Sequence, residues 1–169
     1  MKIFKFGGAS VKDAEGVKNV LQVLQNVGHE EVLLVISAMG KTTNALEVVI
    51  ANYFEKSKEL NASLQEVRKY HNQILLDLFE DEDHEVFFDV NAHFDDLEYF
   101  IRSTKSPNHS FVYDQVVCIG ELVSTTIVSH YFNFRGLKNN WIDVRPLIKT
   151  DNNYRDGQVD WEATQKLIS

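Results

Sequence analysis

The sequence predicts an α/β protein, a three-layer α/β/α fold built around a mainly parallel sheet. Three observations in its first 37 residues favour this class. Residues 2–6 form a short apolar run that ends at Gly7-Gly8, residues 13–27 have helical spacing, and residues 31–37 form a second apolar run. A strand, a helix and a strand in this order make a βαβ unit, in which the strands are parallel and the crossover is right-handed.

The first helix has a start signal, a stop signal and a single apolar face. Asp13 is placed to cap its N-terminus, and Gly28 follows its expected end. Its apolar residues recur at intervals of three and four, namely Val17, Val20, Leu21, Leu24 and Val27. The run Glu-Val-Leu-Leu-Val-Ile-Ser that follows does not alternate with polar residues. This pattern is typical of a parallel strand covered on both faces.

Residues 44–105 consist mostly of helix-forming residues. Apolar positions again recur at helical spacing, as in Leu64, Val67, Ile74, Leu75 and Leu78. No linker rich in proline, glycine or serine flanks this region. We therefore predict a helical insertion into one domain rather than a second domain. Its acid-rich part, residues 77–98, is expected to face solvent.

The C-terminal third contains two further predicted elements before a polar tail. Residues 115–119 would form a short strand or the start of a helix. Gly120-Glu121 would then open a helix that runs to about Phe134 and ends at Gly136. Residues 141–144 are a candidate for a third strand. The turn-rich tail is expected to become helical after residue 160.

The composition of the chain disfavours several classes of function. The chain has 17 basic and 25 acidic residues, a formal net charge of -8. This balance disfavours a surface for nucleic acid or an anionic membrane. No apolar run approaches the roughly 20 residues of a membrane span, and the N-terminus lacks a signal-peptide pattern. A single cysteine, Cys118, precludes an internal disulfide, and no histidine spacing indicates a metal site. We expect a soluble, cytoplasmic protein.

The glycine pair is the first candidate binding element. After a parallel strand, Gly7 and Gly8 would expose backbone N–H groups at the carboxyl edge of the sheet, where α/β proteins bind ligands. Such groups, with a helix N-terminus behind them, favour anionic oxygens. Lys5 could bring its ammonium group to the same oxygens. The alternative is an ordinary tight turn with a lysine that reaches solvent.

The second candidate is the segment Ser37-Ala38-Met39-Gly40-Lys41-Thr42-Thr43-Asn44. Its Gly-Lys-Thr suggests a P-loop, but a P-loop needs another glycine where this chain has Val35, so we reject it. A strand end followed by small and hydroxyl residues can hold a carboxylate or phosphate. The alternative is a serine at a strand end and a threonine helix cap. Glu121 is a third candidate, but a glutamate in the first turn of a helix is also favoured by the helix dipole and then needs no function.

Four segments taken together resemble aspartate kinase, a member of the amino-acid kinase family with a carbamate kinase-like fold. They are residues 5–11, 35–44, 119–121 and 143–145, and the resemblance extends from Met1 to about Thr164. Ala9 stands where the family commonly has threonine. The resemblance implies that residues 1–169 are the amino-acid-substrate part of a kinase domain. The family's Gly-Arg-Gly-Gly-Ser-Asp segment, its nucleotide half and its ACT regulatory domains have no counterpart here.

The resemblance also implies a reaction and a site. Aspartate kinase transfers the γ-phosphoryl group of Mg-ATP to the β-carboxylate of L-aspartate, giving 4-phospho-L-aspartate, the first step of lysine, threonine and methionine biosynthesis. Lys5 would neutralise the transferring group, beside Gly7, Gly8 and Ser10. Aspartate would contact Ser37, Ala38, Thr43 and Glu121, the last as a buried carboxylate paired with the α-ammonium group. The acceptor carboxylate is already ionised at neutral pH, so no general base is required.

Two functional hypotheses follow from the resemblance. In the first, the chain is part of an aspartate kinase, inactive alone, that needs the missing C-terminal half and forms a homo-oligomer when full length. In the second, it is a short non-catalytic protein that binds an amino acid or regulates the kinase. The resemblance does not indicate which end product would inhibit the enzyme.

Overall fold

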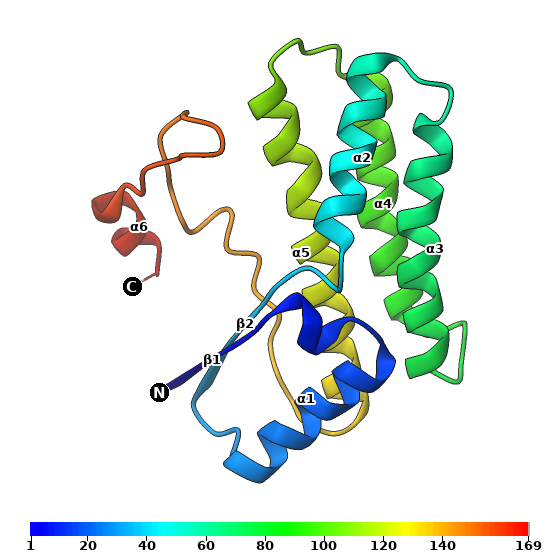
Figure 1. Cartoon of the computed structure of the whole chain (residues 1–169). Coiled ribbons are helices and arrows are strands. Elements are labelled where there is room, and N and C mark those ends of the chain that lie inside the picture. Colours follow the sequence, from blue (N-terminus) through cyan, green and yellow to red (C-terminus); the bar gives the residue numbers. More distant parts are fainter. Residues whose placement is uncertain (169) are drawn as a thin grey trace.

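The computed structural model describes residues 1–168 and shows a small parallel sheet beside a bundle of helices (Figure 1). Helices α2, α3, α4 and α5 pack side by side, and α1 lies at the sheet end of this bundle. In chain order the elements are β1 (Lys2–Phe6), η1 (Gly8–Val11), α1 (Ala14–Val27), β2 (Val32–Ile36), α2 (Thr42–Glu55), α3 (Leu60–Leu78), α4 (Glu85–Ser103), α5 (His109–Phe134) and α6 (Trp161–Ile168).

The predicted βαβ unit is confirmed. Strands β1 and β2 pair in parallel with Lys5 opposite Val35, and α1 connects them. Asp13 caps α1 as expected, because its carboxylate accepts a hydrogen bond of 2.8 Å from the backbone N–H of Gly16. Gly28 ends the helix with a φ of 83°, a conformation that suits glycine.

The sheet is covered on one face within residues 1–168. Side chains that alternate along the two strands, those of Phe4, Phe6, Val32, Leu34 and Ile36, pack against the helical core. Those of the opposite face are open, with Ile3 63%, Leu33 43% and Val35 46% exposed. The α/β class is therefore confirmed, but the expectation of a strand covered on both faces holds for one face only.

The predicted helical region is confirmed as helical. It contains α2, α3 and α4, and α2 begins at Thr42, two residues earlier than expected. The acid-rich segment covers the end of α3, a short linker and most of α4. Its acidic side chains in the linker are exposed, whereas Phe79, Val86, Val90, Phe94 and Leu97 are buried. The segment is therefore amphipathic: its acidic linker side chains face solvent, and its apolar side chains face the core.

Helix α5 corrects two expectations. Residues 115–119 are neither a strand nor a helix start, because a single helix of 26 residues runs through them. Glu121 therefore lies in mid-helix, far from the N-terminal dipole. Gly120 does not open the helix but allows close packing, since a Cβ there would come within 3.0 Å of the Ala38 Cβ. The buried stripe of Val112, Val116, Ile119, Val123 and Ile127 explains the helix.

Helix α5 is also long and apolar enough to cross a membrane, which the sequence analysis did not anticipate. Its most apolar window has a mean hydropathy of 1.4, and 56% of that window is buried inside the fold. Burial against α2 and α4 accounts for this apolarity, as in the central helix of a helical core.

The third predicted strand is wrong. Residues 141–144 have no strand partner in the described part of the chain, and they run along α5 instead. Their side chains make the attachment, because Trp141 Nε1 donates a hydrogen bond of 2.9 Å to Thr125 Oγ1. The predicted helix after residue 160 is confirmed as α6, and the Asp160 carboxylate accepts from the N–H of Ala163.

Candidate functional site

The loops that follow β1 and β2 are joined at the carboxyl edge of the sheet. Ser37 N–H donates a hydrogen bond of 3.1 Å to Phe6 O, and Gly40 N–H donates one of 3.0 Å to Gly8 O. The first loop continues into η1, and the second continues into α2. The glycine loop and the serine loop, residues 7–10 and 37–41, therefore form one unit, because the carboxyl ends of two paired parallel strands lie at the same edge of the sheet.

The two glycines play different roles. A Cβ at Gly8 would lie 2.6 Å from Ala38 O and 3.0 Å from Gly40 O, which no side chain tolerates. A Cβ at Gly7 would meet nothing within 4 Å, so the backbone there is open to a ligand. Gly8 is thus needed for contact between the loops, and Gly7 leaves one side of the turn accessible.

Lys5 and Ser10 lie on either side of this turn. The Lys5 side chain is exposed on the open face of the sheet, and the described residues provide it with no hydrogen bond or ion pair. Ser10 is exposed in η1, and its N–H donates a hydrogen bond of 2.9 Å to Gly7 O. An ammonium group without a protein partner is available to an anionic ligand at the end of the strand.

Helix α5 holds the serine loop from one side. Glu121 Oε1 accepts a hydrogen bond of 3.4 Å from Ala38 N–H, and Ser124 Oγ donates one of 2.8 Å to Ser37 O. Glu121 is exposed, so the expectation of a buried carboxylate is wrong. The side chain lies at the rim of the site because the loop covers only one side of the helix. Its second carboxylate oxygen has no hydrogen-bond partner among the described residues and remains open to a cation.

The start of α2 does not have the threonine cap that was the alternative to a ligand-binding role. Lys41 is the N-cap residue and makes no side-chain capping bond. Thr43, for which the resemblance implied a contact with aspartate, lies half-buried in the first turn. The buried neighbour Thr42 makes the specific contacts, because its Oγ1 donates a hydrogen bond of 2.6 Å to Met39 O. Residue spacing alone could not distinguish these two threonines.

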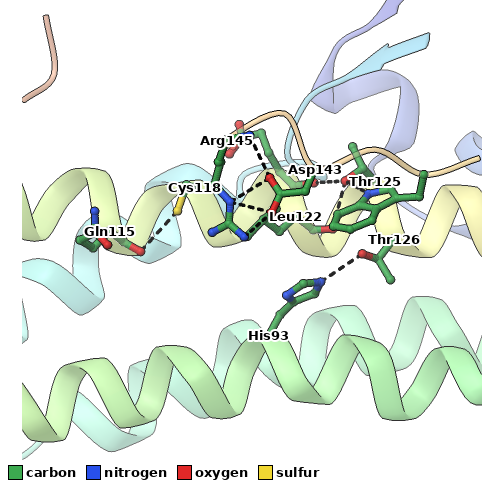
Figure 2. A network of polar contacts seen from close by, with 10 residues as sticks. His93, Gln115, Cys118, Leu122, Thr125, Thr126, Asp143 and Arg145 are labelled. Carbon is green, nitrogen blue, oxygen red and sulfur yellow. Dashed lines mark hydrogen bonds and ion pairs between the residues drawn. The ribbon is translucent and has the colours of Figure 1, made fainter. Parts of the chain in front are cut away.

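A polar strip along α5 was missed by the sequence analysis (Figure 2). Thr125 Oγ1 accepts from Trp141 and donates to Glu121 O at 2.7 Å, which fixes the indole one turn from the Glu121 side chain. Asp143 and Arg145 form an ion pair of 2.7 Å beside it. The hydrogen bonds from Arg145 lower the pKa of the Asp143 carboxyl, so the pair stays charged. Segment 141–145 thus supports the part of α5 that carries Glu121.

Cys118 lies in the same strip but has the environment of an inert thiol. Its Sγ donates to Gln115 O at 3.4 Å, and burial raises its pKa above the ordinary value. A raised pKa keeps the thiol protonated and unreactive at neutral pH. The strip is therefore a structural support, with no nucleophile.

A separate groove lies on the α3 side of Thr42. It has a volume of about 410 Å³ and is lined by Lys12, Lys41, Thr42, Ala45, Glu66, Val67 and Tyr70. Its walls are mostly apolar, and it contains none of the predicted ligand residues. The predicted residues instead surround an open surface at the strand ends, where the two loops and α5 meet.

His71 of α3 is buried behind this surface and gives a pH-dependent prediction. Burial lowers its pKa from 6.5 to about 4, so the folded chain holds the ring neutral. The aromatic rings around it, Tyr70 and Phe94, carry no charge at this pH. Between pH 6.5 and 4 the unfolded chain binds this proton and the folded chain does not. The free energy of unfolding should therefore fall by about 2 to 3 kcal/mol as pH drops through that window.

The measurement is urea unfolding of the chain and of His71→Gln at several values between pH 4 and 8. Carboxylates titrate in both proteins, so the difference between the two curves isolates His71. The wild-type chain should lose more stability on acidification. If the free energy of unfolding fell equally with pH in both proteins, His71 would not have the lowered pKa that its burial implies.

The geometry defines an α/β protein in which two joined loops and the Glu121 carboxylate meet at the edge of a parallel sheet. The family model described as "Amino acid kinase family" matches residues 1–169. The chain belongs to the amino acid kinase family.

Individual relatives within this family are aspartokinases. The chain is 27% identical over 154 residues to bifunctional aspartokinase/homoserine dehydrogenase 2 of Escherichia coli, covering 89% of this chain and 18% of that protein. It is 27% identical over 175 residues to chloroplastic aspartokinase 1 of Arabidopsis thaliana, covering 99% of this chain and 29% of that protein. The chain thus spans less than a third of the length of these relatives.

Solved aspartokinases share the fold. E. coli aspartokinase III in complex with aspartate and ADP matches with a TM-score of 0.82 at 22% identity, over 99% of this chain and 36% of that one. The same enzyme in complex with lysine and aspartate gives a TM-score of 0.84 at 21% identity. The aspartate kinase of Clostridium acetobutylicum gives 0.75 at 19%. The predicted amino-acid kinase fold is confirmed.

Proposed function

We propose that this chain is the amino-acid-binding part of an aspartate kinase. The observation that carries the proposal is the hydrogen bond between Glu121 and the Ala38 N–H, which brings a carboxylate with one open oxygen to the loop joined to Gly8. A carboxylate next to backbone N–H groups suits an α-amino acid, whose cationic and anionic groups lie a few bonds apart. The similarity to aspartokinases supports L-aspartate as the substrate.

The reaction is transfer of the γ-phosphoryl group of Mg-ATP to the β-carboxylate of L-aspartate. Glu121 pairs with the α-ammonium group, while Ser37, Ala38 and Thr43 contact the rest of the amino acid. Lys5, the N–H groups of Gly7 and Gly8, and the Ser10 hydroxyl face the transferring phosphoryl group. Because the acceptor carboxylate is already ionised, catalysis consists of positioning and charge neutralisation. Magnesium arrives as part of the substrate Mg-ATP.

The nucleotide is held mainly outside this chain in our proposal. Residues 1–169 form the amino-acid-substrate part of the kinase domain, with the helical region around 44–105 as an insertion. The partner is the C-terminal half of the same enzyme, and the complete enzyme is a cytoplasmic homo-oligomer. This chain covers only 18% of the E. coli relative and 29% of the A. thaliana relative, which supports this division of the enzyme.

The test is ATP-dependent formation of aspartyl phosphate, trapped as the hydroxamate. It compares the 169-residue chain with the complete protein that carries this sequence. We expect hydroxamate from the complete protein and none from the chain. Hydroxamate from the chain alone would contradict the division of the site. Aspartate binding without hydroxamate from either protein would support the non-catalytic alternative.

Glu121 provides the sharpest test of the substrate. In the complete protein, Glu121→Gln should raise the KM for L-aspartate about 10- to 100-fold, since a charge-assisted bond is replaced by a neutral one. The amide oxygen can still accept from Ala38 N–H, so folding is preserved. Glu121→Ala should raise KM at least as much. A normal KM in Glu121→Gln would remove the carboxylate from the site.

A further inference from the structure

A buried serine of α5 holds the backbone of the serine loop. Ser124 is fully buried, and its Oγ donates a hydrogen bond of 2.8 Å to Ser37 O. A hydroxyl in mid-helix commonly donates to a carbonyl of its own helix, as the neighbouring Thr125 does to Glu121 O. Ser124 uses its one proton across the interface instead, and within residues 1–168 it is the only hydrogen-bond donor to Ser37 O. Loss of the hydroxyl would leave this carbonyl without a donor from the chain.

The close approach of α5 to the loop allows this short side chain to reach the backbone. Gly120 lies about one turn before Ser124 on the helix. A Cβ at Gly120 would come within 3.0 Å of Ala38 Cβ and 3.2 Å of Thr42 Cγ2. Both distances are tighter than ordinary van der Waals contact, so a larger residue would push the loop away from the helix. Glycine thus keeps α5 close enough for Ser124 to bond a main-chain oxygen.

Glu121 contacts the other end of the same peptide unit. The C=O of Ser37 and the N–H of Ala38 belong to one peptide bond, and this N–H donates a hydrogen bond of 3.4 Å to Glu121 Oε1. The peptide bond is trans and planar, so its C=O and N–H point in opposite directions and can only rotate together. Side chains three residues apart lie on one face of a helix, which lets Glu121 and Ser124 hold the two ends.

The lengths and surroundings of the two hydrogen bonds show which one controls the peptide unit. The bond from Ser124 has the usual length for a hydroxyl donor, whereas the bond to Glu121 is longer than the roughly 3.2 Å limit of typical N–H···O bonds. Glu121 is also exposed, so water competes for its carboxylate, while Ser124 is shielded from water. The serine bond therefore sets the orientation of the peptide unit, and the carboxylate follows the N–H.

We propose that Ser124 is a positioning residue for the candidate site. It fixes the peptide unit between Ser37 and Ala38, and the fixed N–H of Ala38 holds Oε1 of Glu121. The second oxygen of Glu121 then keeps one direction, in which it can pair with the ammonium group of the substrate. The effect on substrate binding rests on the proposed function, but the coupling from Ser124 through the peptide unit to Glu121 does not.

Amide hydrogen exchange of the 169-residue chain, followed by NMR, tests the coupling. In Ser124→Ala the peptide unit loses its anchor, so exchange of the Ala38 N–H should accelerate about three- to tenfold. The N–H groups of Ser37 and Gly40, which bond Phe6 O and Gly8 O, should stay within about twofold of their wild-type rates. Equal acceleration of all three N–H groups, or none at Ala38, would overturn the coupling, whether or not the protein is a kinase.

The matched control is Ser129→Ala, which removes the same kind of hydroxyl from the same helix. Ser129 Oγ donates its hydrogen bond of 2.7 Å to Asn139 Oδ1 rather than to the serine loop. Exchange of the Ala38 N–H should therefore stay at its wild-type rate in this variant. Glu121→Ala removes the acceptor itself and should accelerate that exchange. Acceleration by Ser129→Ala as large as that by Ser124→Ala would also overturn the coupling.

The positioning role is tested by kinetics of the complete protein. Ser124→Ala should raise the KM for L-aspartate about three- to tenfold and lower kcat less than about twofold, because a misdirected carboxylate weakens binding of the amino acid. The KM for ATP should stay within about twofold, as should both constants of Ser129→Ala. In the Glu121→Ala background, Ser124→Ala should raise the KM for L-aspartate by less than about twofold, since both residues act through one peptide unit.

Two kinetic outcomes would overturn the positioning role in an active protein. One is an equal KM for L-aspartate in Ser124→Ala and Ser129→Ala. The other is an additive increase in KM when Ser124→Ala is combined with Glu121→Ala, which would mean that Ser124 acts elsewhere. An inactive wild-type protein would contradict the proposed function, and exchange of the Ala38 N–H would then decide the coupling by itself.

Discussion

Replacing Lys5 with alanine should lower the turnover of the complete protein about 100- to 1,000-fold while the KM for L-aspartate changes less than about threefold. Lys5 is exposed at the end of β1, and the described residues give its ammonium group no partner. In the proposed reaction that charge meets the transferring phosphoryl group, where negative charge is concentrated in the transition state. An interaction made mainly in the transition state affects kcat rather than KM.

Lys2 is the matched control, because it is an exposed lysine on the same strand. Lys2 precedes Lys5 by three residues, and its Nζ donates a hydrogen bond of 3.3 Å to Val27 O. Lys2→Ala should keep turnover within about twofold, since surface substitutions of this kind have small effects. Steady-state kinetics of both variants, with aspartate and ATP varied separately, provide the comparison. Equal turnover in Lys5→Ala and Lys2→Ala would remove Lys5 from the reaction.

Periodicity predicted the first part of the fold well because local signals are strong there. Asp13, the apolar stripe of α1 and Gly28 each act within one helix, and the structure confirms them except at the last stripe position, because Val27 is 46% exposed at the helix end. The third strand failed for the opposite reason. Whether residues 141–144 form a strand depends on a pairing partner elsewhere, and Trp141 instead bonds Thr125 of α5. Strand propensity describes a residue's environment more than its backbone.

The candidate site was predicted unevenly for similar reasons. The glycine and serine loops follow parallel strands, so their contact could be inferred from topology, and Gly8 and Gly40 confirm it. Glu121 was identified by resemblance, but it was placed at a helix start and buried, because a glycine before it imitates a helix boundary. The His71–Thr42 contact had no sequence signal, since nothing in either segment specifies that α3 packs behind α2.

The two glycines of the first loop should respond very differently to alanine. In Gly8→Ala the new Cβ would lie 2.6 Å from Ala38 O and 3.0 Å from Gly40 O, and both oxygens belong to backbone that cannot rotate away. Relief requires the two loops to separate, which breaks the hydrogen bond from Gly40 N–H to Gly8 O. We expect the free energy of unfolding of the 169-residue chain to fall by about 3 kcal/mol, the upper range for overpacking.

Gly7→Ala is the matched control, one residue away in the same loop. Its φ of -77° is open to any residue, and a Cβ there meets nothing within 4 Å. Urea unfolding should therefore show a change below about 0.5 kcal/mol, or a slight gain from the reduced freedom of the unfolded chain. Equal losses in both variants would mean that the loop needs glycine for flexibility. A loss in Gly8→Ala alone would show that close contact between the strand ends holds the site together.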